Sequence, residues 1–164
     1  RSPPQNPSKS VLDRETRLGD NREMFEYVID GNRIVDLETL CREFERAVGA
    51  DVGSFGSTLH RFDDRLFGGF ELRRPCKIQW RNSASTRQAL DSKQLLKLCA
   101  TYEEEMRSKG NWFDDSMAEG RAWVESTTRT AAAGERTLFD EILELLKTVS
   151  TRSAERAGIK IELR

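Results

Sequence analysis

Three side chains that could do chemistry lie close together in one short stretch, residues 53–70. His60, Asp63 and Asp64 fall within five residues of one another, and His60 is the only histidine among 164 residues. A histidine four residues before an aspartate on a helix can form a general acid–base pair. Histidine and aspartate can also bind a metal, and exposed carboxylates can bind the cationic groups of another protein. The stretch therefore raises three alternatives, which are catalysis, metal binding and protein binding.

The surrounding sequence favours protein binding over the other two. It contains no nucleophile elbow, no phosphate-binding glycine loop and no second histidine. Adjacent residues on a helix point in different directions, which makes Asp63 and Asp64 a poor pair of metal ligands. We therefore expect no catalytic residue, no metal and no cofactor, and we predict that the protein is not an enzyme.

A short helix is needed to position these residues. Ser57 or Thr58 can cap its N-terminus, and Gly68-Gly69 can end it. An apolar stripe predicts which side is buried, and it consists of Leu59, Phe62 and Leu66.

The same geometry, at about 100° per residue, predicts the exposed side of this helix. Asp64 lies opposite the apolar stripe, His60 and Phe67 share its outward strip, and Asp63 lies nearer the boundary. An exposed aromatic residue beside a charge is typical of protein–protein interfaces.

Composition excludes several other classes of function. The net charge is -1 and no basic stripe is present, so direct nucleic-acid binding is not expected. No apolar run approaches the roughly 20 residues of a membrane span, so no membrane association is expected. The odd number of cysteines, without metal-ligand spacing, indicates small buried residues in a cytoplasmic protein; they are Cys41, Cys76 and Cys99.

The rest of the chain reads as alternating strands and helices. Residues 25–29, 76–80 and 159–163 have the pattern of strands. Residues 37–48, capped by Asp36 and ended by Gly49, and residues 138–149 have the apolar spacing of amphipathic helices. Strands separated by helices pair in parallel, and the alternation within two of them predicts one less buried sheet face. We predict a two-layer α/β fold.

Two regions stand outside this pattern. Residues 1–22 are polar and contain Pro3, Pro4 and Pro7, so they are expected to form a tail or linker. Between the second and third strands, residues 91–109 read as a helix, residues 111–126 as a weaker helix and residues 127–134 as a loop.

The order of these elements and several motifs resemble the barstar family of ribonuclease inhibitors. The motifs are Ile29-Asp30-Gly31, Phe55-Gly56-x-x-Leu59, Asp64-x-Leu66-x-Gly68-Gly69-Phe70 and Ile78-x-Trp80-Arg81-Asn82-Ser83. The resemblance covers about residues 25–90 and 136–164. It implies a barstar-like domain over 23–164, with a three-stranded parallel sheet packed on helices and an additional helical insertion at 91–135.

The resemblance also implies a function for the short helix. Family members block the active site of a ribonuclease with this helix and the loop before it, and an aspartate, here Asp64, occupies the place of the substrate phosphate. The implied partner-binding residues are Ser54, Phe55, Gly56, Thr58, His60, Asp63, Asp64 and Phe67. The implied protein is a bacterial antitoxin or immunity protein whose partner is a ribonuclease or another nuclease toxin.

The first turn of the helix departs from the family pattern. Family members usually carry an acidic residue where this chain has His60, and Arg61 adds a positive charge. A nearly neutral helix should be steered less strongly toward a cationic cleft, which favours a partner other than a barnase-type enzyme. The alternative hypothesis is a non-inhibitory interaction module that uses the barstar-like scaffold and the helical insertion.

Overall fold

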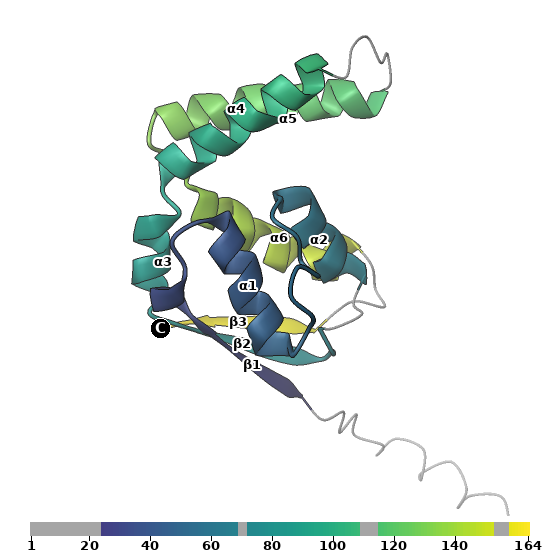
Figure 1. The fold of residues 1–164 in the computed structure, drawn as a ribbon, viewed down its shortest axis with the longest axis vertical. Coiled ribbons are helices and arrows are strands. Elements are labelled where there is room, and N and C mark those ends of the chain that lie inside the picture. The colour runs from purple at the N-terminus through teal and green to yellow at the C-terminus, as the bar shows by residue number, and fades with distance from the viewer. Residues whose placement is uncertain (1–23, 69–71, 109–114, 153–157) are drawn as a thin grey trace, which may run out of the picture.

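The fold is built on a three-stranded parallel sheet. The computed structural model of the chain describes residues 24–68, 72–108, 115–152 and 158–164 (Figure 1). The strands β1 (Phe25–Asp30), β2 (Cys76–Arg81) and β3 (Ile159–Leu163) lie in the order β1-β2-β3, all parallel. The three expected strands and their parallel pairing are confirmed.

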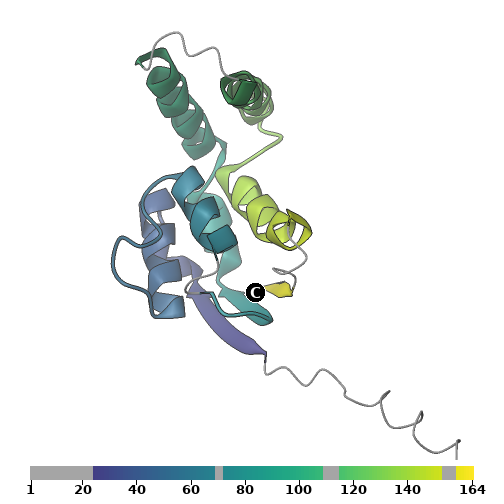
Figure 2. The same cartoon turned by 90° about the vertical axis from the view of Figure 1, so that its right-hand side faces the viewer.

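Helices cover one face of this sheet. The layer consists of α1 (Leu37–Val48), α2 (Leu59–Gly68) and α6 (Leu138–Arg152) (Figures 1 and 2). The opposite face is polar, and there the Nζ of Lys77 lies 2.8 Å from a carboxylate oxygen of Glu162. The two-layer α/β architecture is therefore confirmed.

A helical hairpin extends beyond the helical layer, on the side away from the sheet. After the short helix α3 (Ser83–Ala89), the chain forms α4 (Ser92–Ser108) and α5 (Asp115–Ala132), which lie side by side (Figures 1 and 2). Their contact includes the rings of Tyr102 and Trp123, whose centroids are 5.9 Å apart.

Two differences from the sequence-based expectation concern this region. The expected loop at 127–134 was wrong, because α5 continues to Ala132. Its buried stripe of small residues, Val124, Thr127 and Ala131, lacks the strong apolar signal of a core helix. The helix α3 was not expected, because its only buried residue is Thr86. The proposed tail at 1–22, residues 69–70 of the family motif and the start of the weaker helix at 111–114 lie outside the described residues.

Five aromatic rings join the sheet to the helices that cover it. Phe44 of α1 lies at the centre, with ring centroids 4.9 Å from Phe62 of α2 and 5.8 Å from Trp80 of β2. Trp80 in turn meets Phe139 of α6 at 5.3 Å, and Phe55 meets Phe62 at 5.8 Å. All five side chains are almost completely buried. This aromatic cluster fixes α2 against the domain core.

The loop between α1 and α2 is held by a buried carboxylate. Glu45 of α1 is 3% exposed, and its Oε1 accepts a hydrogen bond of 2.9 Å from the backbone N–H of Phe55. The backbone N–H of Ala50 donates to the carbonyl of Glu45, and Gly49 has a φ of 71°, as the expected helix end requires. The loop therefore enters α2 from a fixed position.

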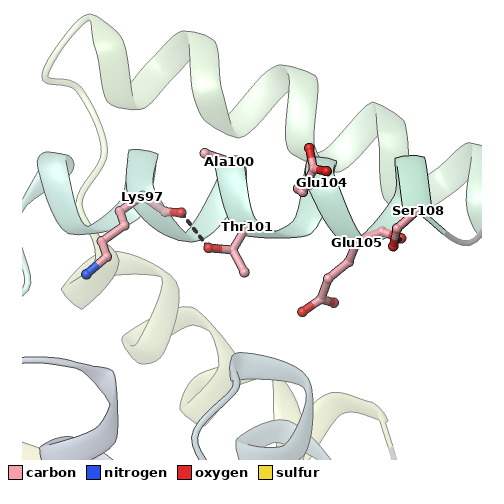
Figure 3. Close-up of a pocket in the computed structure, with 6 residues that line it drawn as sticks. All are labelled: Lys97, Ala100, Thr101, Glu104, Glu105 and Ser108. Carbon is pink, nitrogen blue, oxygen red and sulfur yellow. Dashed lines mark hydrogen bonds between the residues drawn. The ribbon is translucent and has the colours of Figure 1, made fainter.

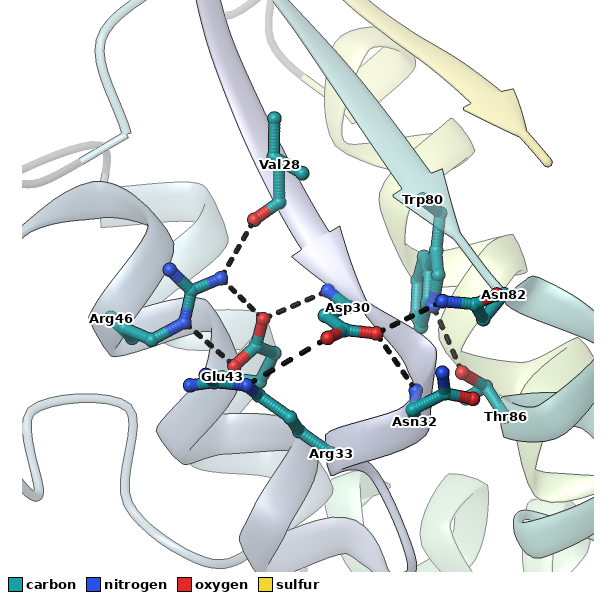
Figure 4. Close-up of polar contacts among 9 residues, drawn as sticks. All are labelled: Val28, Asp30, Asn32, Arg33, Glu43, Arg46, Trp80, Asn82 and Thr86. Atoms are coloured by element: carbon teal, nitrogen blue, oxygen red, sulfur yellow. Dashed lines mark hydrogen bonds and ion pairs between the residues drawn. The ribbon is translucent and has the colours of Figure 1, made fainter.

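The carboxyl ends of β1 and β2 are locked together by the residues of two family motifs (Figure 4). The Asp30 carboxylate accepts hydrogen bonds from the backbone N–H of Asn32 and the side-chain amide of Asn82, both 3.1 Å long. The Trp80 indole N–H donates to the Thr86 hydroxyl at 3.0 Å. A Cβ atom on Gly31 would lie 2.2 Å from the backbone oxygen of Asn82, so only glycine fits there. These motifs are structural and hold the carboxyl ends of β1 and β2 together.

The three cysteines are buried free thiols, as expected. Burial raises the pKa of Cys41 to about 12 and the pKa of Cys76 to about 11. Such thiols stay protonated near neutral pH and behave as small apolar side chains.

Exchanging Gly31 for alanine should destabilise the domain, because the new methyl group collides with backbone. We expect Gly31→Ala to lower the free energy of unfolding by about 1–3 kcal/mol or more, as overpacking does. Gly120, inside α5 with only an ordinary contact at 3.8 Å, is the matched control. There the same exchange should raise stability by about 0.5–1 kcal/mol, because alanine is the better helix former. Urea unfolding measures both values, and equal effects would contradict the close packing at Gly31.

Removing the buried carboxylate should loosen the loop before α2. We expect Glu45→Ala to cost about 1–3 kcal/mol, because the N–H of Phe55 loses its buried acceptor. Glu45→Gln keeps a carbonyl oxygen and should cost clearly less. Urea unfolding gives the stabilities, and hydrogen exchange at the Phe55 amide gives the local effect. An unchanged exchange rate in Glu45→Ala would show that this hydrogen bond does not hold the loop.

Candidate protein-binding face

The exposed side of α2 is the surface that the motifs single out. Leu59, Phe62 and Leu66 are buried, as the apolar stripe predicts. Thr58 caps the helix, since its hydroxyl oxygen accepts a hydrogen bond of 3.2 Å from the backbone N–H of Arg61. The remaining residues of the helix form what we call the α2 face, and its central members are His60, Asp64 and Phe67.

Asp64 is the solvent-facing carboxylate of the α2 face. Its side chain is 63% exposed, and one oxygen lies 3.4 Å from the Nε2 of His60, whose side chain is 81% exposed. Because its helix is fixed by the aromatic cluster, the carboxylate can meet a cationic group of another protein without reordering the backbone.

The neighbouring Asp63 has a different environment. It faces α6, where both oxygens of its carboxylate accept hydrogen bonds from the guanidinium of Arg152, one of them 2.7 Å long. The pair raises the pKa of Arg152. Asp63 therefore joins α2 to α6, and its charge is offset within the chain. Sequence reasoning missed this partner, because it lies 89 residues away and on another helix.

Phe67 completes the α2 face toward its C-terminal end. The ring is 38% exposed, and the guanidinium carbon of Arg152 lies 5.4 Å from its centroid. Arg152 thus contacts both Asp63 and Phe67 and fixes this end of the face against α6.

The loop before α2 and its junction with the helix contain the other predicted partner-binding residues, which lie in different environments. Phe55 is completely buried, so its side chain anchors the loop from inside and cannot itself reach a partner. Ser54 and Thr58 are half-buried, and Gly56 lies under Arg61, whose Cδ would be 2.7 Å from a Cβ at that position.

One exposed apolar residue of this loop was not expected from the sequence. Val52 is 91% exposed, two residues before Ser54. The sequence gives only a weak signal for it, an isolated apolar residue between Asp51 and Gly53. It is an exposed apolar side chain in the loop that leads into α2.

The hairpin lies at the N-terminal end of α2, which the sequence did not indicate. The buried hydroxyl of Tyr102 faces the backbone N–H groups of Leu59 and His60. Burial raises the pKa of Tyr102, and the two N–H groups partly offset this. Its neighbours Lys97, Thr101 and Glu105 border a hollow of about 230 Å³ that also includes Ser57 and Thr58. In Figure 3 these three side chains of α4 project from the side of the helix that faces the domain.

The geometry of the α2 face suits binding better than catalysis or metal coordination. The His60–Asp64 pair lies on an open helix surface, with both side chains largely exposed. Among the described residues, no group of three or more His, Cys, Asp or Glu side chains is arranged to hold a metal ion. In the same part of the chain, no helix is long and apolar enough to cross a membrane.

A family model described as Barstar (barnase inhibitor) matches residues 24–118, more than half of the chain. The match includes β1, α1, α2, β2 and α4 and ends within α5. No curated protein matches the chain. The matched segment contains β1, the helix α2 with Asp64, and the joined carboxyl ends of β1 and β2. The chain therefore belongs to the barstar family.

Proposed function

We propose that this protein is a nuclease inhibitor, of the antitoxin or immunity type, that acts in the bacterial cytoplasm. In this proposal the α2 face and the loop before it cover the active site of a ribonuclease or another nuclease toxin. The protein is not an enzyme and acts by binding alone. The observation that carries the proposal is the exposed carboxylate of Asp64 on a rigid helix, in a chain of the barstar family.

The chemistry of a nuclease active site explains why a carboxylate would bind there. Such sites bind phosphate with arginine, lysine and histidine side chains. A carboxylate accepts the same charge-assisted hydrogen bonds as a phosphate, and arginine can bind it through two of them. Asp64 would therefore occupy the position of an RNA phosphate, while Phe67 and Val52 would supply apolar contacts around it.

The charge of the α2 face favours a partner with a modestly cationic site. Asp63 is paired with Arg152, His60 lies beside Asp64, and Arg61 adds a positive charge. Long-range attraction to a strongly basic cleft is correspondingly weak. Specificity would then depend on short-range contacts around Asp64.

The helical hairpin favours a second candidate function, a non-inhibitory interaction module. The hairpin stands outside the sheet and its helical layer (Figure 1), and we propose that residues 91–135 are an insertion in a barstar-like domain spanning 23–164. In a module, the hairpin would bind the partner and the α2 face would not.

Removing the Asp64 carboxylate should restore nuclease activity. The test uses RNA cleavage by barnase and by any nuclease encoded beside this gene, with the chain added in excess. We expect Asp64→Ala to weaken inhibition by about 2 kcal/mol or more, roughly 30-fold, because the cationic site loses its buried partner. Glu125→Ala is the matched control, since Glu125 is also exposed and also pairs with a basic residue at a spacing of four along its helix. It should leave inhibition unchanged.

Two results of this experiment would contradict the inhibitor proposal. One is that the wild-type chain leaves RNA cleavage by every such nuclease unaffected. The other concerns a protein partner isolated by pull-down with the wild-type chain. In that result Asp64→Ala binds the partner as tightly as the wild type, while deletion of residues 95–126 abolishes binding. That second result would establish the module.

A further inference from the structure

A hollow of about 200 Å³ lies beside the α2 face, where α2, α6 and the hairpin meet. Its apolar wall comes from all three parts of the fold and consists of Leu59, Tyr102, Trp123 and Leu145. The two aromatic rings belong to the hairpin and are half-buried. The hollow therefore combines aromatic surface with access to solvent.

Of the polar residues that line this hollow, two are acidic and one is a histidine. They are His60 and Asp63 of α2 and Glu141 of α6. Each carboxylate is paired with an arginine, Asp63 with Arg152 and Glu141 with Arg136, but neither arginine is among the residues that line the hollow. An entering group thus meets two carboxylates and two aromatic rings.

The hollow is continuous with the α2 face. His60 and Asp63 belong to both, and Asp64 follows directly. Tyr102 belongs to the hairpin, and its buried hydroxyl faces the first N–H groups of α2. A protein that covers Asp64 therefore comes within reach of the hairpin.

We propose that this hollow receives an arginine or lysine side chain of the bound nuclease, which makes the hairpin a second wall of the binding site. The proposal rests on the proposed function. Aromatic faces attract guanidinium and ammonium groups, and the carboxylate oxygens can accept further hydrogen bonds from them although their charges are already offset by arginines. Nuclease surfaces that bind RNA carry such side chains next to the active site. Tryptophan, tyrosine and arginine in such pockets are also the residue types enriched among binding hot spots.

Substitutions at Trp123 and Leu145 test this proposal with the nuclease that the wild-type chain inhibits. Trp123→Ala removes the larger ring and should weaken inhibition at least about tenfold, whereas Trp123→Phe keeps an aromatic face and should stay within about threefold. Leu145→Lys puts a positive charge into the hollow and should weaken inhibition at least about tenfold, whereas Leu145→Met should stay within about threefold. Circular dichroism of each full-length variant verifies the fold.

The outcomes separate this proposal from the proposed function. If Asp64→Ala loses inhibition while Trp123→Ala and Leu145→Lys inhibit like the wild type, the hairpin pocket is refuted and the inhibitor function stands. If Leu145→Lys inhibits more tightly than Leu145→Met, the occupant is not basic and the proposal is overturned. If Asp64→Ala also inhibits like the wild type, the proposed function itself fails. Glu125→Ala, on the other side of α5 from Trp123, should behave like the wild type throughout.

Discussion

The packing of Phe62 against Phe44 is the contact on which the α2 face depends. It places α2 on the aromatic cluster of α1, β2 and α6, and Phe55 extends the same cluster under the preceding loop. Because the buried side of the helix is fixed in this way, the outward direction of Asp64 follows from helix geometry alone. A binding face that is ordered before the partner arrives avoids the entropic cost of ordering it during association. Under the proposed function, the core of this domain serves directly to present one carboxylate.

Two adjacent aspartates of α2 have separate tasks because they face different surroundings. Asp63 points to α6 and forms a two-bonded pair with Arg152, which stabilises the junction of two helices. Asp64 points to solvent and keeps its charge available for a partner. Charge is therefore concentrated at one position rather than spread along the helix. Under the proposed function, such a face would bind through short-range complementarity, and the hairpin next to His60 would add contacts that a bare helix lacks.

Local patterns were sufficient to predict the sheet, the main helices and the buried side of α2. The stripe Leu59, Phe62 and Leu66 and the alternation of Cys76, Ile78 and Trp80 report burial directly, and each of these residues is buried. Contacts between distant segments could not be predicted in this way. The Asp63–Arg152 pair and the approach of Tyr102 to α2 depend on how helices pack, which no local spacing encodes. The burial of Phe55, which the family resemblance placed among the partner-binding residues, was likewise not predicted.

The most direct test of the proposed function is a crystal structure of this chain in complex with a nuclease that the RNA-cleavage assay identifies as its target. The account predicts that the Asp64 carboxylate lies within about 3 Å of an arginine, lysine or histidine nitrogen in the phosphate-binding site of the enzyme. The α2 face should cover that site, with Asp63 still paired to Arg152. A complex in which Asp64 remains in solvent, or in which the nuclease active site stays open, would contradict the account.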